Sequence, residues 1–222
     1  MLFAASFTLA AANPELDHAR DTQDRAALER LEAQAATDAQ KQSSDAQAQY
    51  RAALASSYLA EIAIEVGDKA RARSAAESGI QAGQRAVALN AQFAEFHRLL
   101  GTLCGQAVSS NPLSVLKYGR CAQEEINKAI ELDPKSALNY VGRGVGNYYL
   151  PPAMGGGVDL AIKDFQKAVG LDAKLAEAHL WLGIALRKAG RNADARAELQ
   201  KASDLAPSRV WAKQQLAKTP AQ

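Results

Sequence analysis

The sequence predicts an all-α protein, a solenoid of antiparallel helix hairpins. Alanine is very common and is mixed with Glu, Lys, Arg and Gln, which favour helix. Alternating runs of Val, Ile and Thr, which would indicate strands, are hard to find. An internal repeat adds to this: four short strings with Ala first and Leu fourth align at 86–91, 129–134, 168–173 and 202–207. A helical unit that recurs in this way is typical of stacked hairpins.

The strings identify the type of repeat. Their spacing shortens along the chain, and the last two start about 34 residues apart, which is the period of a tetratricopeptide repeat. The last unit matches the tetratricopeptide consensus at Leu182, Gly183, Gly190, Ala195, Leu199, Ala202 and Pro207. Residues 93–207 therefore resemble tetratricopeptide-repeat proteins. The resemblance implies a superhelix in which small residues let paired helices approach and large residues fill the gaps between them.

Two of the predicted hairpins have enlarged turns. In the standard unit, the repeat glycine Gly183 is followed on the second helix by Ala195. The corresponding pairs, Gly144 with Ala161 and Gly101 with Ala122, are separated by longer stretches. The surplus falls at 150–157 and 109–119. Insertions of this kind map to loops along one edge of a solenoid, so neither turn is a domain boundary.

The rest of the chain is predicted to cap this solenoid, which comprises about three and a half hairpins. Upstream, Gly67 and Asp68 form the turn of a further helix pair, and Trp211 at the other end covers the last repeat. The expected divisions are a signal peptide over 1–12, a polar helix over 13–47, the solenoid over 48–207 and a capping helix and tail over 208–222. The most typical repeats span 93–134, 137–173 and 176–207.

A narrower resemblance rests on the strings HRLLGTLCGQ, INKAIELDP and GRGVGNYYLPP, with Tyr118 in the long turn. They are similar to the repeat domain of the regulator of microtubule dynamics proteins and their bacterial relatives. The resemblance implies an all-α solenoid without catalysis. It leaves the partner open, since the eukaryotic role does not transfer to a small exported protein. A second analogy, carried by the repeats alone, is the periplasmic tetratricopeptide protein that serves TRAP-type solute transporters.

Composition and motifs argue against several classes of function. The formal net charge of the 222 residues, +2, is too small to argue for nucleic acid or a charged membrane surface. No run of eighteen apolar residues predicts an integral membrane helix. The histidines, His18, His97 and His179, lack ligand spacing, and the last two share a ring slot with Tyr140, four residues before a repeat glycine. Gly155–Gly157 lacks a phosphate-loop context. We therefore expect no enzyme, metal or cofactor.

Two features bear on the compartment. The uncharged residues 1–12 contain the apolar run Leu2–Leu9 and an Ala-x-Ala pattern, although no basic residue precedes the run. We expect a signal peptide and a periplasmic or secreted mature chain from about Asn13; otherwise the protein is cytoplasmic. Cys104 and Cys121 lie at equal distances from the middle of the long turn. A disulfide fits an exported protein, two buried thiols fit the alternative, and both remain open.

The function that the sequence favours is partner binding. The concave surface of such a solenoid comes from the first helix of each hairpin, and aromatic residues and Arg are usual interface anchors. The candidate residues for a protein or peptide partner are Glu95, Arg98, Tyr148, Tyr149, Trp181, Arg187 and Lys188. The alternative is a small-molecule carrier or transporter accessory protein with an apolar cavity under the two enlarged turns. The partner, the pathway and a homo-oligomeric state are left open.

Overall fold

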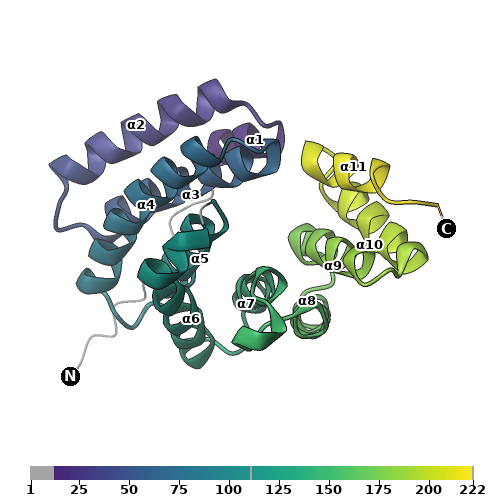
Figure 1. Ribbon diagram of the computed structural model, residues 1–222. Coiled ribbons are helices and arrows are strands. Elements are labelled where there is room, and N and C mark those ends of the chain that lie inside the picture. The colour runs from purple at the N-terminus through teal and green to yellow at the C-terminus, as the bar shows by residue number, and fades with distance from the viewer. Residues whose placement is uncertain (1–12, 111, 222) are drawn as a thin grey trace.

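The computed structural model describes residues 13–110 and 112–221, and every regular element in these ranges is helical (Figure 1). None of the helices described is long and apolar enough to cross a bilayer. Two short 3₁₀ helices, η1 and η2, lie in the enlarged turns. The helices are α1 (Pro14–Asp21), α2 (Arg25–Lys41), α3 (Ala46–Val66), α4 (Lys69–Leu89), α5 (Ala94–Ser110), η1 (Pro112–Ser114), α6 (Val115–Leu132), α7 (Ala137–Tyr149), η2 (Pro152–Met154), α8 (Val158–Leu171), α9 (Ala176–Lys188), α10 (Asn192–Leu205) and α11 (Val210–Ala217).

The helices stack as consecutive antiparallel hairpins, which confirms the predicted tetratricopeptide superhelix. The hairpins are α3–α4, α5–α6, α7–α8 and α9–α10, with α2 packed on α3 and α11 on α10. Their first helices also contact one another in the order α3, α5, α7, α9, and so form the inner layer. The chain curves until α1, near its start, lies beside α11, near its end (Figure 1).

Glycines set the distance between the two helices of a hairpin. A Cβ atom on Gly183 of α9 would lie 2.5 Å from Leu199 Cγ on α10, closer than real Cβ atoms approach. The glycine therefore lets the large side chain pack directly against the backbone of the facing helix. The same arrangement recurs in the two preceding hairpins, between Gly144 and Phe165 at 2.5 Å and between Gly101 and Ile126 at 2.8 Å.

The predicted ring slot is confirmed in all three hairpins. Each ring is hydrogen-bonded to the carbonyl oxygen of the residue six positions earlier, in the turn that precedes its helix. The pairs are His97 Nε2 with Ala91 O at 2.9 Å, Tyr140 Oη with Pro134 O at 3.1 Å and His179 Nε2 with Ala173 O at 3.1 Å. The other ring nitrogen of each histidine faces a glutamate on the second helix. These bonds fix each connection between hairpins to the hairpin that follows.

The N-terminal region differs from the sequence prediction. The polar helix expected over 13–47 is divided into α1, α2 and the start of α3. Gln23 takes a positive φ of 55°, and the Asp24 side chain accepts a hydrogen bond from the Ala27 backbone N–H. This cap begins a new helix, because it satisfies a donor that the first turn leaves free. Asp45 caps α3 in the same way.

The buried apolar core of the described residues is divided between the two halves of the solenoid. One hydrophobic cluster spans α1 to α6, and a second spans α7 to α10. Ile126 lies at the joint: it packs on Gly101 within its own hairpin, and a Cβ on Gly142 of α7 would lie 2.8 Å from its Cδ1. Trp211 of α11 covers the last repeat, as predicted, and packs with Leu199.

We predict that Gly183→Ala destabilises the protein by about 1–3 kcal/mol, because the added methyl group overpacks the contact with Leu199. Gly105→Ala is the matched control, since Gly105 lies in the middle of α5 and a Cβ added there would meet nothing within 4 Å. The control should gain about 0.5–1 kcal/mol from helix propensity. Denaturant unfolding of both variants gives the two free energies. If Gly183→Ala left the free energy of unfolding unchanged, the two helices of the hairpin would be able to move apart without loss of stability.

Candidate binding surface

The candidate site is the inner surface formed by α3, α5, α7 and α9, to which α1 and α11 add side chains. Glu95 and Arg98 lie three residues apart on α5 and form an ion pair, with Arg98 Nε 2.6 Å from Glu95 Oε2. The hydroxyl of Tyr50 on α3 donates to Glu95 Oε1 at 2.9 Å, and burial of this ring raises the pKa of Tyr50. The two predicted residues are thus brought together and neutralise one another.

The predicted aromatic residues also come together. The rings of Tyr148 and Tyr149 meet edge to face at 5.1 Å, and both approach Trp181 at 5.9 and 6.3 Å. Trp181 continues the cluster to Trp211 at 5.3 Å, and its Nε1 donates to Glu177 at 2.9 Å. Tyr149 is the exposed member, with 48% of its surface accessible. Partial burial raises its pKa to about 12, so the hydroxyl stays protonated.

Arg187 and Lys188 have local partners at the far end of α9. Arg187 donates to the backbone and side-chain oxygens of Gln215 at 3.0 and 2.6 Å, and so holds α11 in place. Lys188 Nζ donates to the carbonyl oxygen of Tyr148 at 2.9 Å and lies 4.0 Å from the centre of its ring. Arg187 therefore joins α9 to α11. The structure does not bring it together with Glu95 and Arg98.

The sequence analysis missed a cluster that joins the two ends of the solenoid. Arg209, just before α11, is only 2% exposed. Its guanidinium lies 2.6 Å from Glu61, forms an ion pair with Glu65, and has Asp21 and Glu177 at 3.9 Å. These five residues, which we call the clasp, come from α1, α3, α9 and the turn before α11. Two side-chain hydrogen bonds reinforce it, Gln214 to Gln23 and Ser208 to Asp21.

The clasp carries an excess of negative charge. Burial raises the pKa of Glu61 to about 7, and the nearby Glu177 and Glu65 add to the shift against the attraction of Arg209. Burial likewise raises the pKa of Glu65. Burial alone would lower the pKa of Arg209, but the field of the surrounding carboxylates outweighs it and raises that pKa. The arginine therefore stays charged, whereas Glu61 is the member that changes protonation near neutral pH.

Two hollows on the outer surface differ in lining: the first is mainly polar, and the second mixes charged side chains with Val87, Leu100 and Cys121. One of about 440 Å³ lies along α4 and is lined by residues that include Arg73 and Glu77. A second, of about 410 Å³, lies between α4 and α6 and includes Lys117, Arg120 and Glu124. Neither is the closed apolar cavity that a carrier would need. Across residues 13–110 and 112–221, no cluster of His, Cys, Asp and Glu is arranged to hold a metal ion.

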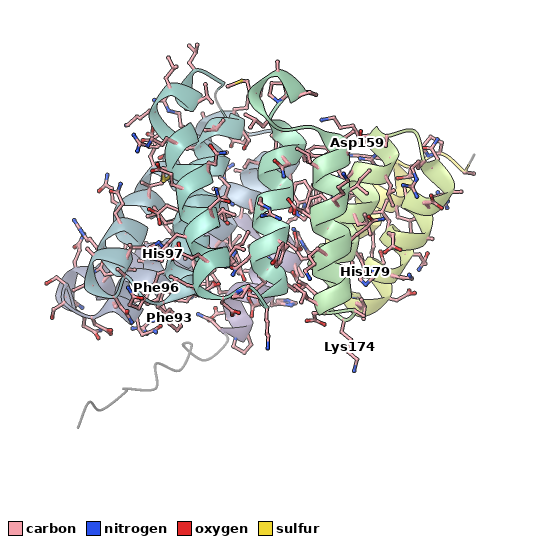
Figure 2. All side chains as sticks on the ribbon, turned by 90° about the horizontal axis from the view of Figure 1, so that it is seen from below. Phe93, Phe96, His97, Asp159, Lys174 and His179 are labelled. Carbon is pink, nitrogen blue, oxygen red and sulfur yellow. A yellow bond between two sulfur atoms is a disulfide. The ribbon has the colours of Figure 1, made fainter. Side chains whose placement is uncertain are left out.

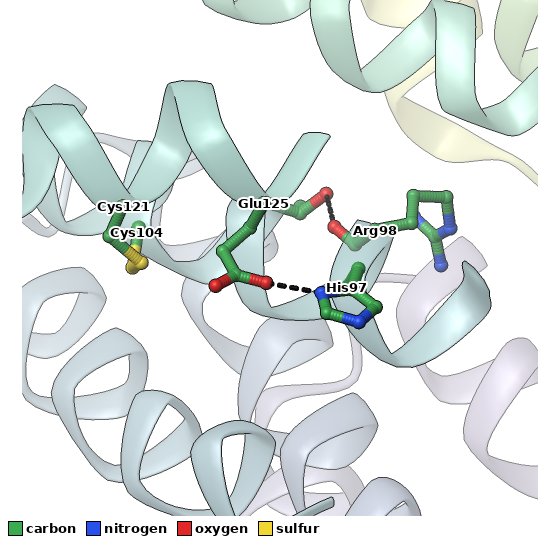
Figure 3. The surroundings of a disulfide bond; sticks show 6 residues. His97, Arg98, Cys104, Cys121 and Glu125 are labelled. Atoms are coloured by element: carbon green, nitrogen blue, oxygen red, sulfur yellow. Dashed lines mark hydrogen bonds and ion pairs between the residues drawn. A yellow bond between two sulfur atoms is a disulfide. The ribbon is translucent and has the colours of Figure 1, made fainter. Parts of the chain in front are cut away.

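The structure joins Cys104 and Cys121 in a disulfide, with the Cα atoms 6.0 Å apart (Figure 3). The bond links α5 to α6, and Cys104 is fully buried. Because α5 runs to Ser110 and α6 starts at Val115, most of the insertion expected as a turn at 109–119 instead lengthens these two helices. On the same two helices, His97 Nδ1 lies 2.6 Å from Glu125 Oε2. A covalent bond and a hydrogen bond thus hold this hairpin together at two levels.

We expect Glu61→Gln to change how stability depends on pH. Because the pKa of Glu61 is raised on folding, its favourable contribution is fully present below about pH 4.5 and is lost as the pH rises through about 7. The variant should therefore gain about 1–3 kcal/mol relative to the natural protein between these pH values. Urea unfolding across this range measures the difference. Glu124→Gln, on the exposed side of α6, is the control, and a pH-independent difference for Glu61→Gln would contradict the assignment.

Solved structures with a similar fold are tetratricopeptide proteins. The thermophilic protein TTC0263 of Thermus thermophilus is 19% identical, with 92% of this chain and 97% of that chain covered and a TM-score of 0.59. YrrB, described as having an unusual peptide-binding site, is 20% identical over 93% and 91% of the two chains, with a TM-score of 0.44. MamA is 17% identical over 88% and 96%, with a TM-score of 0.45. At these identities the likeness concerns the fold.

Comparison of sequences adds the family. No curated protein matches the chain. The family model for regulator of microtubule dynamics protein 1-3 matches residues 14–150, which run from the start of α1 to the end of α7. The match takes in the first two strings that carry the resemblance and most of the third, and it covers more than half of the chain. The chain belongs to the family of regulator of microtubule dynamics protein 1-3.

Proposed function

We propose that the protein is a non-catalytic scaffold or adaptor that binds a protein or peptide segment at its inner surface. The observation that carries the proposal is the half-exposed ring of Tyr149 beside the acidic clasp. Tyr149 is already packed against Tyr148 and Trp181, so a partner side chain would meet a fixed aromatic surface. Ordered aromatic anchors lose little conformational entropy on binding, which favours affinity.

The charges of the inner surface indicate what kind of segment fits. Glu95 and Arg98 neutralise each other, whereas the clasp has four carboxylates around Arg209, one of which, Asp21, is also paired with Arg20 at 2.7 Å. A partner that carries Lys or Arg next to an apolar residue would satisfy the acidic excess and the aromatic cluster together. The carrier alternative gains no support from the charged linings of the two outer hollows.

The proposal predicts that Tyr149→Ala weakens partner binding about tenfold or more, because truncation of an anchor residue typically costs over 1 kcal/mol. The partner is first captured from the envelope fraction of the native host and identified by mass spectrometry. Its dissociation constant is then measured for the natural protein and for the variant. Leu205→Ala on the outer helix α10 is the matched control, since Leu205 is 41% exposed and lies at the opposite edge of the solenoid from Tyr149.

The two variants separate the possible outcomes. Weaker binding by Tyr149→Ala alone places the partner on the inner surface. Equal affinities for both variants would place it elsewhere. If native mass spectrometry instead finds a small molecule bound to the purified protein and no protein is captured, the carrier function replaces the adaptor.

We also infer that the protein works outside the cytosol. The disulfide between Cys104 and Cys121 supports this inference, because such bonds persist in oxidising compartments and are rare in the cytosol. The expected signal peptide over 1–12 lies outside the described residues. The mature chain would then begin at about Asn13, which is also the residue that caps α1.

Mass analysis of the protein purified from its native host tests the export. The expected result is a chain that starts near Asn13 and resists alkylation of both cysteines until a reductant is added. Cys104→Ser with Cys121→Ser is the control for the labelling. A chain that retains Met1 and two free thiols would contradict the inference.

A further inference from the structure

The most exposed large apolar side chains share one edge of the solenoid. In the described part of the chain they are Leu116 at 92%, Leu113 at 78%, Val66 at 62% and Met154 at 55%. All four lie in or next to a turn within a hairpin. Val66 ends α3, Leu113 lies in η1 between α5 and α6, Leu116 lies in the first turn of α6, and Met154 ends η2 between α7 and α8. Exposed apolar groups gathered in this way mark an interaction surface rather than a random scatter.

The topology explains why these turns lie together. In a stack of antiparallel hairpins, the turns within hairpins follow one edge and the connections between hairpins follow the other. Figure 2 shows the two enlarged turns side by side on one edge, with Asp159 at the start of α8. Phe93 and Lys174, from connections between hairpins, lie at the opposite edge. We call the first the turn edge; among the described residues it comprises 66–73, 109–110, 112–120, 150–163 and 186–194.

The charge of the two edges differs in sign. The turn edge contains nine Lys and Arg residues and three Asp residues. The connections at the opposite edge, 88–95, 130–137, 170–177 and 203–210, contain three basic and six acidic residues. The small net charge of the chain conceals this separation.

Exposed lysines make up much of the positive charge that is left for a partner. Four arginines of the turn edge are paired with carboxylates: Arg71 with Glu29, Arg73 with Glu77, Arg120 with Glu124 and Arg191 with Asp194. Four lysines of the same edge are exposed, and no ion pair of the described residues includes them: Lys69, Lys117, Lys163 and Lys188. They lie on α4, α6, α8 and α9, and so are spread along the whole edge.

We propose that the turn edge is a docking surface for an anionic lipid membrane. Leu116, Leu113 and Met154 enter the interfacial region, while the lysines contact headgroup phosphates. Apolar groups beside basic residues are the combination that binds such an interface, and each Lys near an anionic surface strengthens binding about fivefold. A second copy of the chain fits less well, because two turn edges of the same charge would repel one another. The turn edge borders the inner surface of the proposed function at Arg187 and Lys188, whereas Leu113, Leu116 and Met154 lie in η1, α6 and η2, outside the helices that form the inner surface.

Vesicle co-sedimentation tests the proposal with the full chain and its disulfide intact. The natural protein should sediment with vesicles of phosphatidylcholine and phosphatidylglycerol, and not with phosphatidylcholine alone. Added salt should release it, because the contacts are electrostatic. Leu116→Asp with Met154→Asp should reduce the bound fraction at least tenfold. Both side chains are largely exposed, so the fold is kept, and an unchanged unfolding midpoint verifies this.

Leu89→Asp with Leu205→Asp is the matched control, since both leucines are exposed at the opposite edge. This variant should bind vesicles as the natural protein does. Equal loss of binding in both variants, or no binding to anionic vesicles, would overturn the proposal. So would a dimer in size-exclusion chromatography that Leu116→Asp with Met154→Asp dissociates, because a second copy would then occupy the edge.

Discussion

The architecture depends on how closely the two helices of each hairpin approach at the repeat glycine. Leu199, Phe165 and Ile126 each pack on the bare backbone of a facing glycine, so successive hairpins share one spacing and can stack. Ile126 also packs on Gly142 of the next hairpin, where the buried Asn139 of α7 donates to Ala129 O at 3.0 Å, and neither hydrophobic cluster of the described residues spans this point. The curvature of the solenoid is therefore determined at a thin joint, and a second contact between the halves has a large effect on shape.

The clasp supplies that second contact. A buried ion network contributes little net stability, because the cost of removing its charges from water offsets their attraction. Its value lies in geometry: Arg209 satisfies Glu61 and Glu65 only when α3 and the turn before α11 lie side by side. The clasp therefore fixes the separation of the ends and the width of the inner surface between them. A partner then meets a surface whose shape is set before binding, which lowers the entropic cost of association.

The local features of the fold could be predicted from the sequence, and the contacts between its ends could not. The repeat strings locate the hairpins because each string marks where a small residue of one helix meets a large residue of its partner. The position of the ring, four residues before the repeat glycine, follows from the same alignment of the repeats. Arg209 lies 148 residues from Glu61, and no periodicity reports a contact at that separation. The sequence assigns Arg187 to the inner surface because Arg187 belongs to the first helix of its hairpin. It lies six residues beyond Trp181, however, and therefore on another face of α9, where it bonds to Gln215.

The two insertions are held in different ways: the first mostly lengthens α5 and α6, and the second forms the turn at 150–157. A longer turn raises the entropic cost of closing a hairpin. Between α5 and α6 the disulfide offsets that cost by joining the helices behind the turn. Between α7 and α8 the backbone does so: the Gly157 N–H donates to Asn147 O at 2.9 Å, and Gly155 and Gly157 take positive φ values that suit glycine. Each insertion is thus held in one conformation by its own interactions. An insertion that only filled space would not need such interactions, whereas one that presents leucine or methionine to a surface must keep these side chains in place.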